Sequence, residues 1–280
     1  MNGGTASCSS PVRHKALMRE QQPKADEKAA SQAQGSQQAI RAVKASTLVD
    51  MPVRNQQGEM MGEVEDVMID PSEGRVAYVI LDLGGWFDIG GNLVAAPMEA
   101  LSLSSGEETF TLNVDKAKLR NAPTVAGAYR PAWPVTVRRP WLVDIYGYYG
   151  YPPYSALTAV TVDTLDIASA EAITGIDVEN LQGDDLGEIE ALVIDLGTGR
   201  IVYAMMEYGG WLGMGEELAA VPWKALTPAP GEREFRLDIT QDQLKTIPRF
   251  APDDWSQTLD RQWLADVYAR YGEKPYWGTK

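Results

Sequence analysis

The sequence contains only one cysteine and one histidine, Cys8 and His14, among its 280 residues. Both lie near the N-terminus, so the rest of the chain lacks the side chains that form most zinc sites, most Ser/His and Cys/His nucleophilic sites and any internal disulfide. The glycine pairs at 84–85 and 209–210 do not match the dinucleotide or P-loop patterns either. We therefore expect a protein that is not an enzyme and that uses no cofactor and no metal.

Long apolar runs and an excess of basic side chains are also missing. No stretch of 18 apolar residues could span a membrane, and no apolar signal core follows Met1. We expect a cytoplasmic protein, with the periplasm as the alternative if the N-terminus is truncated. There are 25 Lys and Arg residues against 39 Asp and Glu, a formal net charge of −14. Because such a surface repels phosphates, we expect no nucleic-acid partner.

Residues 1–45 differ in composition from the rest of the chain. They are rich in Gln, Ala, Ser and Lys, and they carry seven basic and three acidic side chains. A segment with so few large apolar residues cannot bury enough surface to offset its chain entropy. We interpret it as a disordered, weakly basic tail.

An internal repeat is the most informative feature of the sequence. When the chain is shifted by 125 residues, Val53–Leu101 aligns without a gap on Val178–Leu226, and 21 of the 49 aligned residues are identical. A second pair, WLVDIYGYYGYPPY at 141–154 and WLADVYARYGEKPY at 263–276, follows at a shift of 122. Two copies are too few for a solenoid, so the pattern indicates two duplicated domains, each followed by an aromatic segment.

Alternation and turn residues predict the elements of each copy. Short apolar or alternating runs separated by Gly, Pro, Asn and Asp favour five or six strands per repeat, which is typical of a small antiparallel barrel or sandwich. Asp115 and Thr240 are expected N-caps of single helical turns. Residues 256–271 predict a fuller helix, whereas Gly147 weakens the helical pattern of the first aromatic segment.

These observations define a fold class and a set of boundaries. The chain is mainly β, with two small antiparallel barrels in tandem, each followed by a short helix and an aromatic-rich helical appendage. We expect the following segments: a polar tail (1–45), repeat 1 (46–124), an aromatic appendage and linker (125–172), repeat 2 (173–250) and a C-terminal amphipathic helix (251–280).

The repeat resembles the PRC-barrel, a β-barrel domain named for the photosynthetic reaction centre. The resemblance lies in the order of four patterns that occur twice: N-x-Q-G, G-E-[VI]-E, [IV]-D-x-x-x-G-R-[VI] and [AV]-P-x-x-A-L. It implies six-stranded barrels that serve as interaction modules, as in the cytoplasmic part of the reaction-centre H subunit and in a ribosome-maturation factor. The sequence departs from both relatives, because it lacks the membrane helix of the H subunit and the separate N-terminal domain of the ribosome factor, and it adds the repeated aromatic segment.

The turn residues that recur in both copies have a structural interpretation. In each copy an Asp accepts backbone N–H groups, a Gly supplies a positive φ and an Arg pairs across the strands. We assign this role to Asp70, Gly74 and Arg75 in repeat 1 and to Asp195, Gly199 and Arg200 in repeat 2.

Aromatic side chains are the candidate interaction residues. Trp86 and Trp211 each follow a glycine pair, where a Trp either plugs a barrel end or meets a partner. The aromatic segments add Trp141, Tyr146, Trp263 and Tyr268, whose rings either pack on their own barrel or form a contact surface.

The function that these patterns favour is a non-catalytic scaffold built from two barrels, an adaptor within a larger membrane-associated or ribonucleoprotein assembly. Its protein partners are unknown, and the two barrels pack on each other or form a homodimer. The alternative is a module that binds a small ligand or a divalent cation through acidic barrel faces, since Glu63, Glu65, Glu188 and Glu190 place paired carboxylates on one face of a strand.

Overall fold

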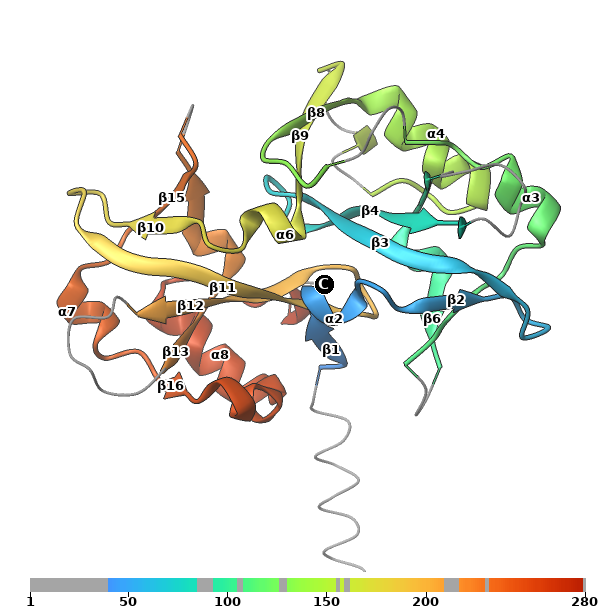
Figure 1. Ribbon diagram of the computed structural model, residues 1–280. Coiled ribbons are helices and arrows are strands. Elements are labelled where there is room, and N and C mark those ends of the chain that lie inside the picture. Colours follow the sequence, from blue (N-terminus) through green and yellow to red (C-terminus); the bar gives the residue numbers. More distant parts are fainter. Residues whose placement is uncertain are drawn as a thin grey trace, which may run out of the picture.

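The computed structural model describes residues 40–84, 93–104, 108–125, 130–154, 157–158, 162–208, 217–229 and 232–278. These residues form two curled β-sheets that lie side by side, one for each repeat, with short helices around them (Figure 1). The chain is mainly β, as its alternating pattern predicts. None of the helices in these ranges has both the length and the hydropathy needed to cross a membrane.

The first sheet contains eight strands and is built around the hairpin of β3 and β4. Its order is β5 (Leu93–Ala96), β4 (Arg75–Asp82), β3 (Met60–Asp70), β2 (Pro52–Arg54), β7 (Phe110–Leu112) and β6 (Leu101–Leu103), with β9 (Thr164–Ser169) on β3 and β8 (Val135–Arg138) on β9. The neighbours are antiparallel except β2 and β7, which are parallel. Strands β2 to β7 therefore match the five or six strands expected for a repeat, and the sheet also gains two strands from the linker.

The second sheet has the same plan. Its order is β14 (Leu226–Pro228), β15 (Glu234–Leu237), β10 (Asp177–Glu179), β11 (Asp185–Asp195), β12 (Ile201–Tyr208), β13 (Leu218–Val221) and β16 (Arg249–Phe250), with β1 (Ala42–Lys44) on β11. Here β10 and β15 are the parallel pair. The shared plan, including the position of the parallel pair, follows from the sequence repeat.

Short helices follow the strands in equivalent places. They are α2 (Ala45–Leu48), η2 (Met98–Ala100), α3 (Lys116–Arg120) and α4 (Arg139–Tyr149) in the first half, and α6 (Ala170–Ile173), η3 (Trp223–Ala225), α7 (Gln241–Leu244), η4 (Pro252–Leu259), α8 (Arg261–Arg270) and η5 (Tyr276–Gly278) in the second. Asp115 caps α3 by accepting a hydrogen bond from the Lys118 amide, and Thr240 forms a capping box with Gln243 at α7. Both expected caps are confirmed.

The two barrels exchange strands. Strand β1 pairs with β11 in the register Val43↔Ile194, and β9 pairs with β3 in the register Ile69↔Ala168. At the shift of 125 residues, β1 is equivalent to the end of β9, so each repeat places the strand that precedes it in the sheet of the other repeat. In Figure 1, β1 and α2 in blue and α6 in yellow lie between the two sheets.

The exchange gives the barrels a common core. One apolar cluster contains buried residues of both repeats, among them Leu48 of α2 and Ile173 of α6, which are 1% and 0% exposed. Two further clusters cover the outer faces, where α4 packs on the first sheet and α8 on the second. The barrels therefore pack on each other within one chain, whereas the oligomeric state of the chain stays a prediction.

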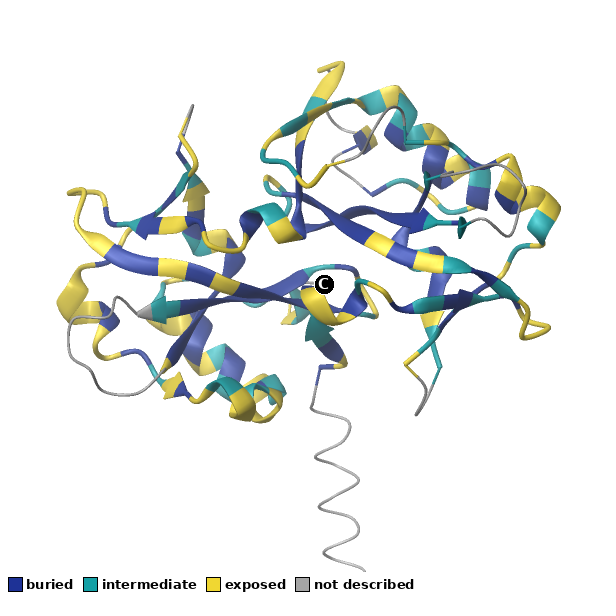
Figure 2. Cartoon of the chain, in the orientation of Figure 1, coloured by how far each residue is buried: buried dark blue, intermediate teal, exposed yellow. Residues whose placement is uncertain are grey.

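Burial along the long strands explains their sequence pattern. β3 and β11 begin with alternating exposed and buried residues and end in a continuously buried run, visible as alternating bands in Figure 2. Alternation marks the stretch with one face in solvent, and the apolar run marks the stretch covered on both faces. Gly62 has a φ of +142°, and a Cβ there would lie 2.3 Å from the Asp82 carbonyl oxygen, so this close approach of two strands requires glycine.

The structure differs from the sequence-based expectations in three places. Strand β1 lies inside segment 1–45, for which the composition predicts a disordered tail, and β9 lies before the expected start of repeat 2 at 173. Helix α4 is complete despite Gly147, because buried Leu142, Ile145, Tyr146 and Tyr149 hold it against the first sheet. The C-terminal helix α8 begins at Arg261, since Asp260 caps it and the preceding residues form the 3₁₀ helix η4.

Candidate functional site

The turn of repeat 1 connects β3 to β4 and is closed by Asp70. This side chain is 1% exposed, and its Oδ1 accepts hydrogen bonds from the amides of Ser72 (3.0 Å) and Glu73 (3.2 Å) and from the Ser72 hydroxyl (2.6 Å). Gly74 completes the turn with a φ of +62°. These contacts are the turn chemistry that the sequence predicts for Asp70 and Gly74, because an Asp side chain replaces backbone acceptors and glycine tolerates the left-handed region.

The turn of repeat 2 has the same construction. Asp195 accepts hydrogen bonds from the Gly197 amide and from the Thr198 hydroxyl, both at 2.8 Å. Gly199 adopts a φ of +66°. Both copies of the motif therefore form the same tight turn between two long strands.

The two turns meet, which the sequence did not indicate. The Val76 amide donates to the Gly199 carbonyl oxygen at 2.7 Å, and the Ile201 amide donates to the Gly74 carbonyl oxygen at 2.9 Å. Arg75 and Arg200 form an antiparallel bridge between these bonds. We call this contact, residues 70–76 with residues 195–201, the junction.

A tyrosine from each aromatic segment binds the turn aspartate on its side of the junction. The Tyr154 hydroxyl donates to Asp70 Oδ2 at 2.8 Å, and the equivalent Tyr276 hydroxyl donates to Asp195 Oδ2 at 2.8 Å. Burial, and next the charge of Asp70, raise the pKa of the Tyr154 phenol above its ordinary value. Both phenols therefore stay protonated donors that fix the turn aspartates.

The two halves of the junction differ in charge. In the first half, Arg75 forms an ion pair with Glu99 at 2.7 Å, and its guanidinium carbon lies 4.5 Å from the centre of the Tyr154 ring. Lys224 occupies the position equivalent to Glu99. Arg200 forms no ion pair with the residues that the structure describes, and its guanidinium carbon lies 5.9 Å from the centre of the Tyr276 ring.

Apolar packing across the junction is also asymmetric. Trp223 is 4% exposed, lies against Gly74 and donates its indole N–H to the Pro71 carbonyl oxygen at 2.8 Å. The equivalent residue of repeat 1 is Met98, which lies 3.8 Å from the position of a Cβ on Gly199. One wide ring thus fills the space on one side, and a flexible thioether fills it on the other.

The candidate interaction residues are in three different situations. Trp86 and Trp211 lie outside the described residues. Tyr146 is fully buried and Tyr268 is 3% exposed, and their hydroxyls donate to carbonyl oxygens of β4 and β12, so neither ring offers an outer contact surface. Trp141 and Trp263 are partly buried against Tyr78 and Phe250, with ring centres 5.2 Å and 6.2 Å apart.

Acidic side chains stand on the solvent face of both long strands. Glu63, Glu65, Glu188 and Glu190 are exposed. Across the hairpins, Glu63 faces Asp82 and Glu188 faces Glu207, so carboxylates lie directly opposite carboxylates in both barrels. Partial burial, and next the charge of Asp82, raise the pKa of Glu65. Like charges in this position destabilise a sheet, so packing does not explain the pattern.

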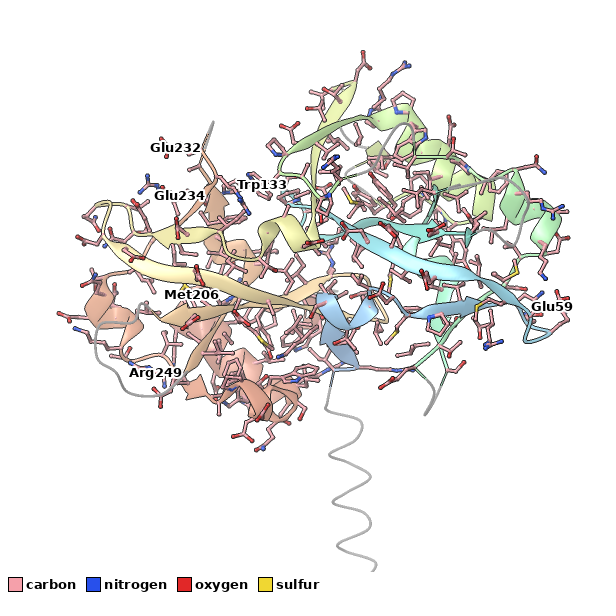
Figure 3. The ribbon with its side chains drawn as sticks, viewed as in Figure 1. Glu59, Trp133, Met206, Glu232, Glu234 and Arg249 are labelled. Atoms are coloured by element: carbon pink, nitrogen blue, oxygen red, sulfur yellow. The ribbon has the colours of Figure 1, made fainter. Side chains whose placement is uncertain are left out.

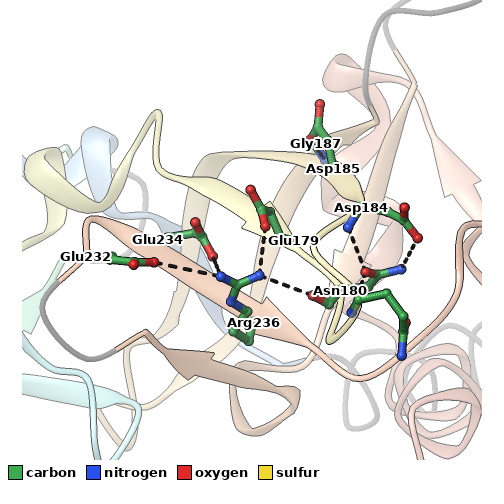
Figure 4. Close-up of polar contacts among 9 residues, drawn as sticks. Glu179, Asn180, Asp184, Asp185, Gly187, Glu232, Glu234 and Arg236 are labelled. Carbon is green, nitrogen blue, oxygen red and sulfur yellow. Dashed lines mark hydrogen bonds and ion pairs between the residues drawn. The ribbon is translucent and has the colours of Figure 1, made fainter.

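A second polar cluster lies on β10 and β15, the parallel strand pair of the second sheet (Figure 4). Arg236 contacts Glu179 at 2.7 Å, Glu234 at 2.7 Å and Glu232 at 3.7 Å, while Asn180 closes the neighbouring turn through Asp184. Trp133, from the linker, packs at 5.2 Å from the Phe235 ring of the same strand, and Figure 3 shows it beside Glu234. These contacts connect β10, β15 and the linker. The charge of Arg236 is neutralised by the carboxylates around it.

The described residues bring no three His, Cys, Asp or Glu side chains together in a way that could hold a metal ion. Sequence reasoning missed the roles of Trp223, Lys224, Glu99 and Trp133. The aligned copies do carry one signal, since the closing pattern [AV]-P-x-x-A-L contains Met-Glu in repeat 1 and Trp-Lys in repeat 2. That difference of size and charge lies at the junction.

Comparison with known families agrees with this duplicated architecture. A family model described as the PRC-barrel domain matches residues 41–119 and again residues 166–244, which is more than half of the chain. The chain belongs to the PRC-barrel family. Each match begins at an exchanged strand, β1 or the equivalent part of β9, so the PRC-barrel unit includes the strand that pairs with the other barrel. None of the curated protein sequences compared with the chain matches it.

Proposed function

We propose that this tandem PRC-barrel protein is a non-catalytic interaction module that presents two acidic strand faces to a basic protein partner within a larger assembly. The observation that carries the proposal is the carboxylate pairing in both barrels, Glu63 opposite Asp82 and Glu188 opposite Glu207. An energetically unfavourable arrangement that occurs twice favours a role outside folding.

Electrostatics makes these faces suitable for a basic surface. None of the four strand glutamates forms an ion pair within the described part of the chain. Burial is the largest cause of the raised pKa of Glu65, and repulsion by Asp82 and other nearby carboxylates adds to it; a Lys or Arg side chain from a partner would relieve that repulsion. Complementary charge of this kind accelerates association and selects partners by sign.

The exchanged strands support a bivalent use of the module. Since each barrel contains a strand of the other and both share a core, the two acidic faces hold a fixed relative position. A partner that contacts both faces loses less entropy in its second contact than it would with two flexibly linked barrels.

Affinity capture from native extract tests the proposal. The bait is wild type, a variant with Glu63→Gln, Glu65→Gln, Glu188→Gln and Glu190→Gln, or a control with the same charge change at exposed sites elsewhere (Asp144→Asn, Asp163→Asn, Glu171→Gln and Asp253→Asn). We expect basic partners to be recovered by wild type and control, and to fall by about tenfold with the strand variant at low salt.

Equal recovery by the strand variant and the control would contradict the proposal. Calorimetry with Ca²⁺ on wild-type protein separates it from cation binding by the same faces. If Ca²⁺ gives saturable heat with wild type and the strand variant loses that heat, the acidic faces bind a divalent cation instead of a protein partner.

A further inference from the structure

A small cavity lies beside the junction, on the side of repeat 2. It measures about 20 Å³ and is lined by Glu73, Gly74, Arg200, Ile201, Trp223, Lys224, Tyr268, Lys274 and Tyr276. These residues come from the turn of the first barrel, from the turn, β12 and η3 of the second barrel, and from α8 and the segment that follows it. A cavity of this volume holds one or two water-sized groups, such as the oxygen atoms at the charged end of a small anion.

The charge of the lining is opposite to that of the protein. Arg200, Lys224 and Lys274 contribute three positive charges and Glu73 one negative charge, in a chain whose formal net charge is −14. None of these four side chains forms an ion pair with another described residue. Converging cations repel each other, and an anion between them removes that repulsion.

In repeat 1, the equivalent arginine is neutralised by a carboxylate of the chain itself. There Arg75, 9% exposed, is paired with Glu99, and Tyr154 stacks on it. At the same shifts, Lys224 replaces Glu99 and Lys274 replaces Pro152. The internal carboxylate of one half is therefore exchanged for two lysines in the other half, which leaves Arg200 without an internal counter-ion.

The aromatic walls of the cavity are fixed beside Arg200, whereas Lys224 and Lys274 are exposed at its rim. The Tyr276 ring, which lies near Arg200, is anchored because its hydroxyl donates to Asp195. Trp223 is anchored through Pro71. An arginine beside fixed aromatic rings loses less rotational freedom when it binds, and its planar group matches the geometry of a carboxylate or phosphate.

We propose that this cavity is an oxyanion site that binds a carboxylate or phosphate group through Arg200, Lys224 and Lys274. The site is separate from the acidic strand faces and does not depend on the function proposed for them. The group belongs to a free small anion or to an acidic segment of a protein. Repeat 1 contains its own carboxylate, Glu99, at the matching place.

Calorimetry on the full chain at low salt tests the site with three probes: inorganic phosphate, acetate and a short poly-glutamate peptide. Lys224→Glu restores the charge pattern of repeat 1 and supplies an internal partner for Arg200. We expect it to weaken binding by at least about tenfold, and Lys274→Gln to weaken it by less. Lys118→Gln, on α3 of the first barrel, is the control and should bind as wild type does. Thermal unfolding checks that each variant is folded.

Binding of phosphate or acetate that Lys224→Glu abolishes identifies a free anion, and binding of the peptide alone identifies an acidic protein segment. Two results overturn the proposal: no saturable heat with any probe, or equal affinity in folded Lys224→Glu and wild type. Neither result bears on the acidic strand faces, because the affinity capture described above uses different residues.

Discussion

The backbone amide of Val76 donates a hydrogen bond to the carbonyl oxygen of Gly199 across 2.7 Å, although the two residues belong to different repeats. The reciprocal bond joins Ile201 to Gly74. Together they connect the two PRC barrels through the turns that the repeated aspartates build. The junction thus combines a local motif with a long-range contact, and its two halves differ in packing and charge.

The close packing at Gly74 leads to the first prediction. A Cβ on Gly74 would lie 2.4 Å from Cδ1 of Trp223, whereas a Cβ on Gly199 would find its nearest neighbours at 3.8 Å. Both glycines have a positive φ, which costs an alanine about 1–2 kcal/mol. Gly199→Ala should lower the free energy of unfolding by about that amount, and Gly74→Ala by about 1–3 kcal/mol more because of the clash.

Urea denaturation of both variants measures this difference. Since Gly74 and Gly199 occupy equivalent turns, the second variant controls for the backbone cost of the first. Equal losses of stability would show that Trp223 does not pack against Gly74 as described.

A buried hydroxyl in an exchanged strand gives the second prediction. Ser169, at the end of β9, is 0% exposed and donates to Oδ2 of Asp66 on β3, which is 2% exposed, at 2.5 Å. Ser169→Ala removes a hydrogen bond to a buried carboxylate, so it should lower the free energy of unfolding by about 1.5–3 kcal/mol.

The matched control is Thr136→Ala, which removes a hydroxyl donor to Asp166 at 2.8 Å on the surface. Exposed partners find water instead, so this change should cost less than about 0.5 kcal/mol. Chemical denaturation measures the free energy of unfolding of both variants. A similar small decrease in the two would contradict the buried pairing of β9 with β3.

Alkaline pH provides the third prediction. Burial raises the pKa of Tyr203 to about 12 from its ordinary value of 10.0, with the hydrogen bond to Thr258 acting in the opposite direction. Burial also raises the pKa of Tyr78, Tyr146, Tyr149, Tyr154, Tyr268, Tyr271 and Tyr276. Above about pH 10 the unfolded chain loses these protons before the folded chain does, so stability is full below that pH and falls as the pH rises towards 12.

Tyrosinate absorbance and circular dichroism, recorded together during an alkaline titration, test this order of events. Most tyrosines should ionise only as the protein unfolds, and Tyr203→Phe should make the decline of stability with pH shallower. Ionisation of these tyrosines near pH 10 in a protein that is still folded would be inconsistent with their burial.

The sequence predicted the parts of the fold that depend on neighbouring residues. Alternating and turn residues predicted five or six strands per repeat, and Asp115 and Thr240 located two helix starts, because a cap or a pleat is decided within a few residues. Helix α4 shows the limit of that approach. Gly147 lowers its intrinsic helix propensity, but burial of the residues around it outweighs that cost.

The exchange of strands could not be predicted from the sequence. Strand β1 has only three residues, Ala42–Lys44, and its partner β11 lies more than 140 residues further along the chain. Nothing in so short a segment specifies which sheet it joins. The oxyanion cavity could not be predicted either. Its lining residues Glu73 and Lys274 are about 200 positions apart in the sequence and line one cavity only in the folded chain.

A disulfide across the exchanged strands tests the central claim, that one chain interlocks its two barrels. Val43 and Ile194 are directly opposed on antiparallel strands, a spacing compatible with a disulfide. In a Cys8→Ser background, Val43→Cys with Ile194→Cys should oxidise to a monomer in which mass spectrometry finds the two peptides joined within one chain. Disulfide-linked dimers, or no crosslink in a folded protein, would contradict the exchange of strands within a single chain.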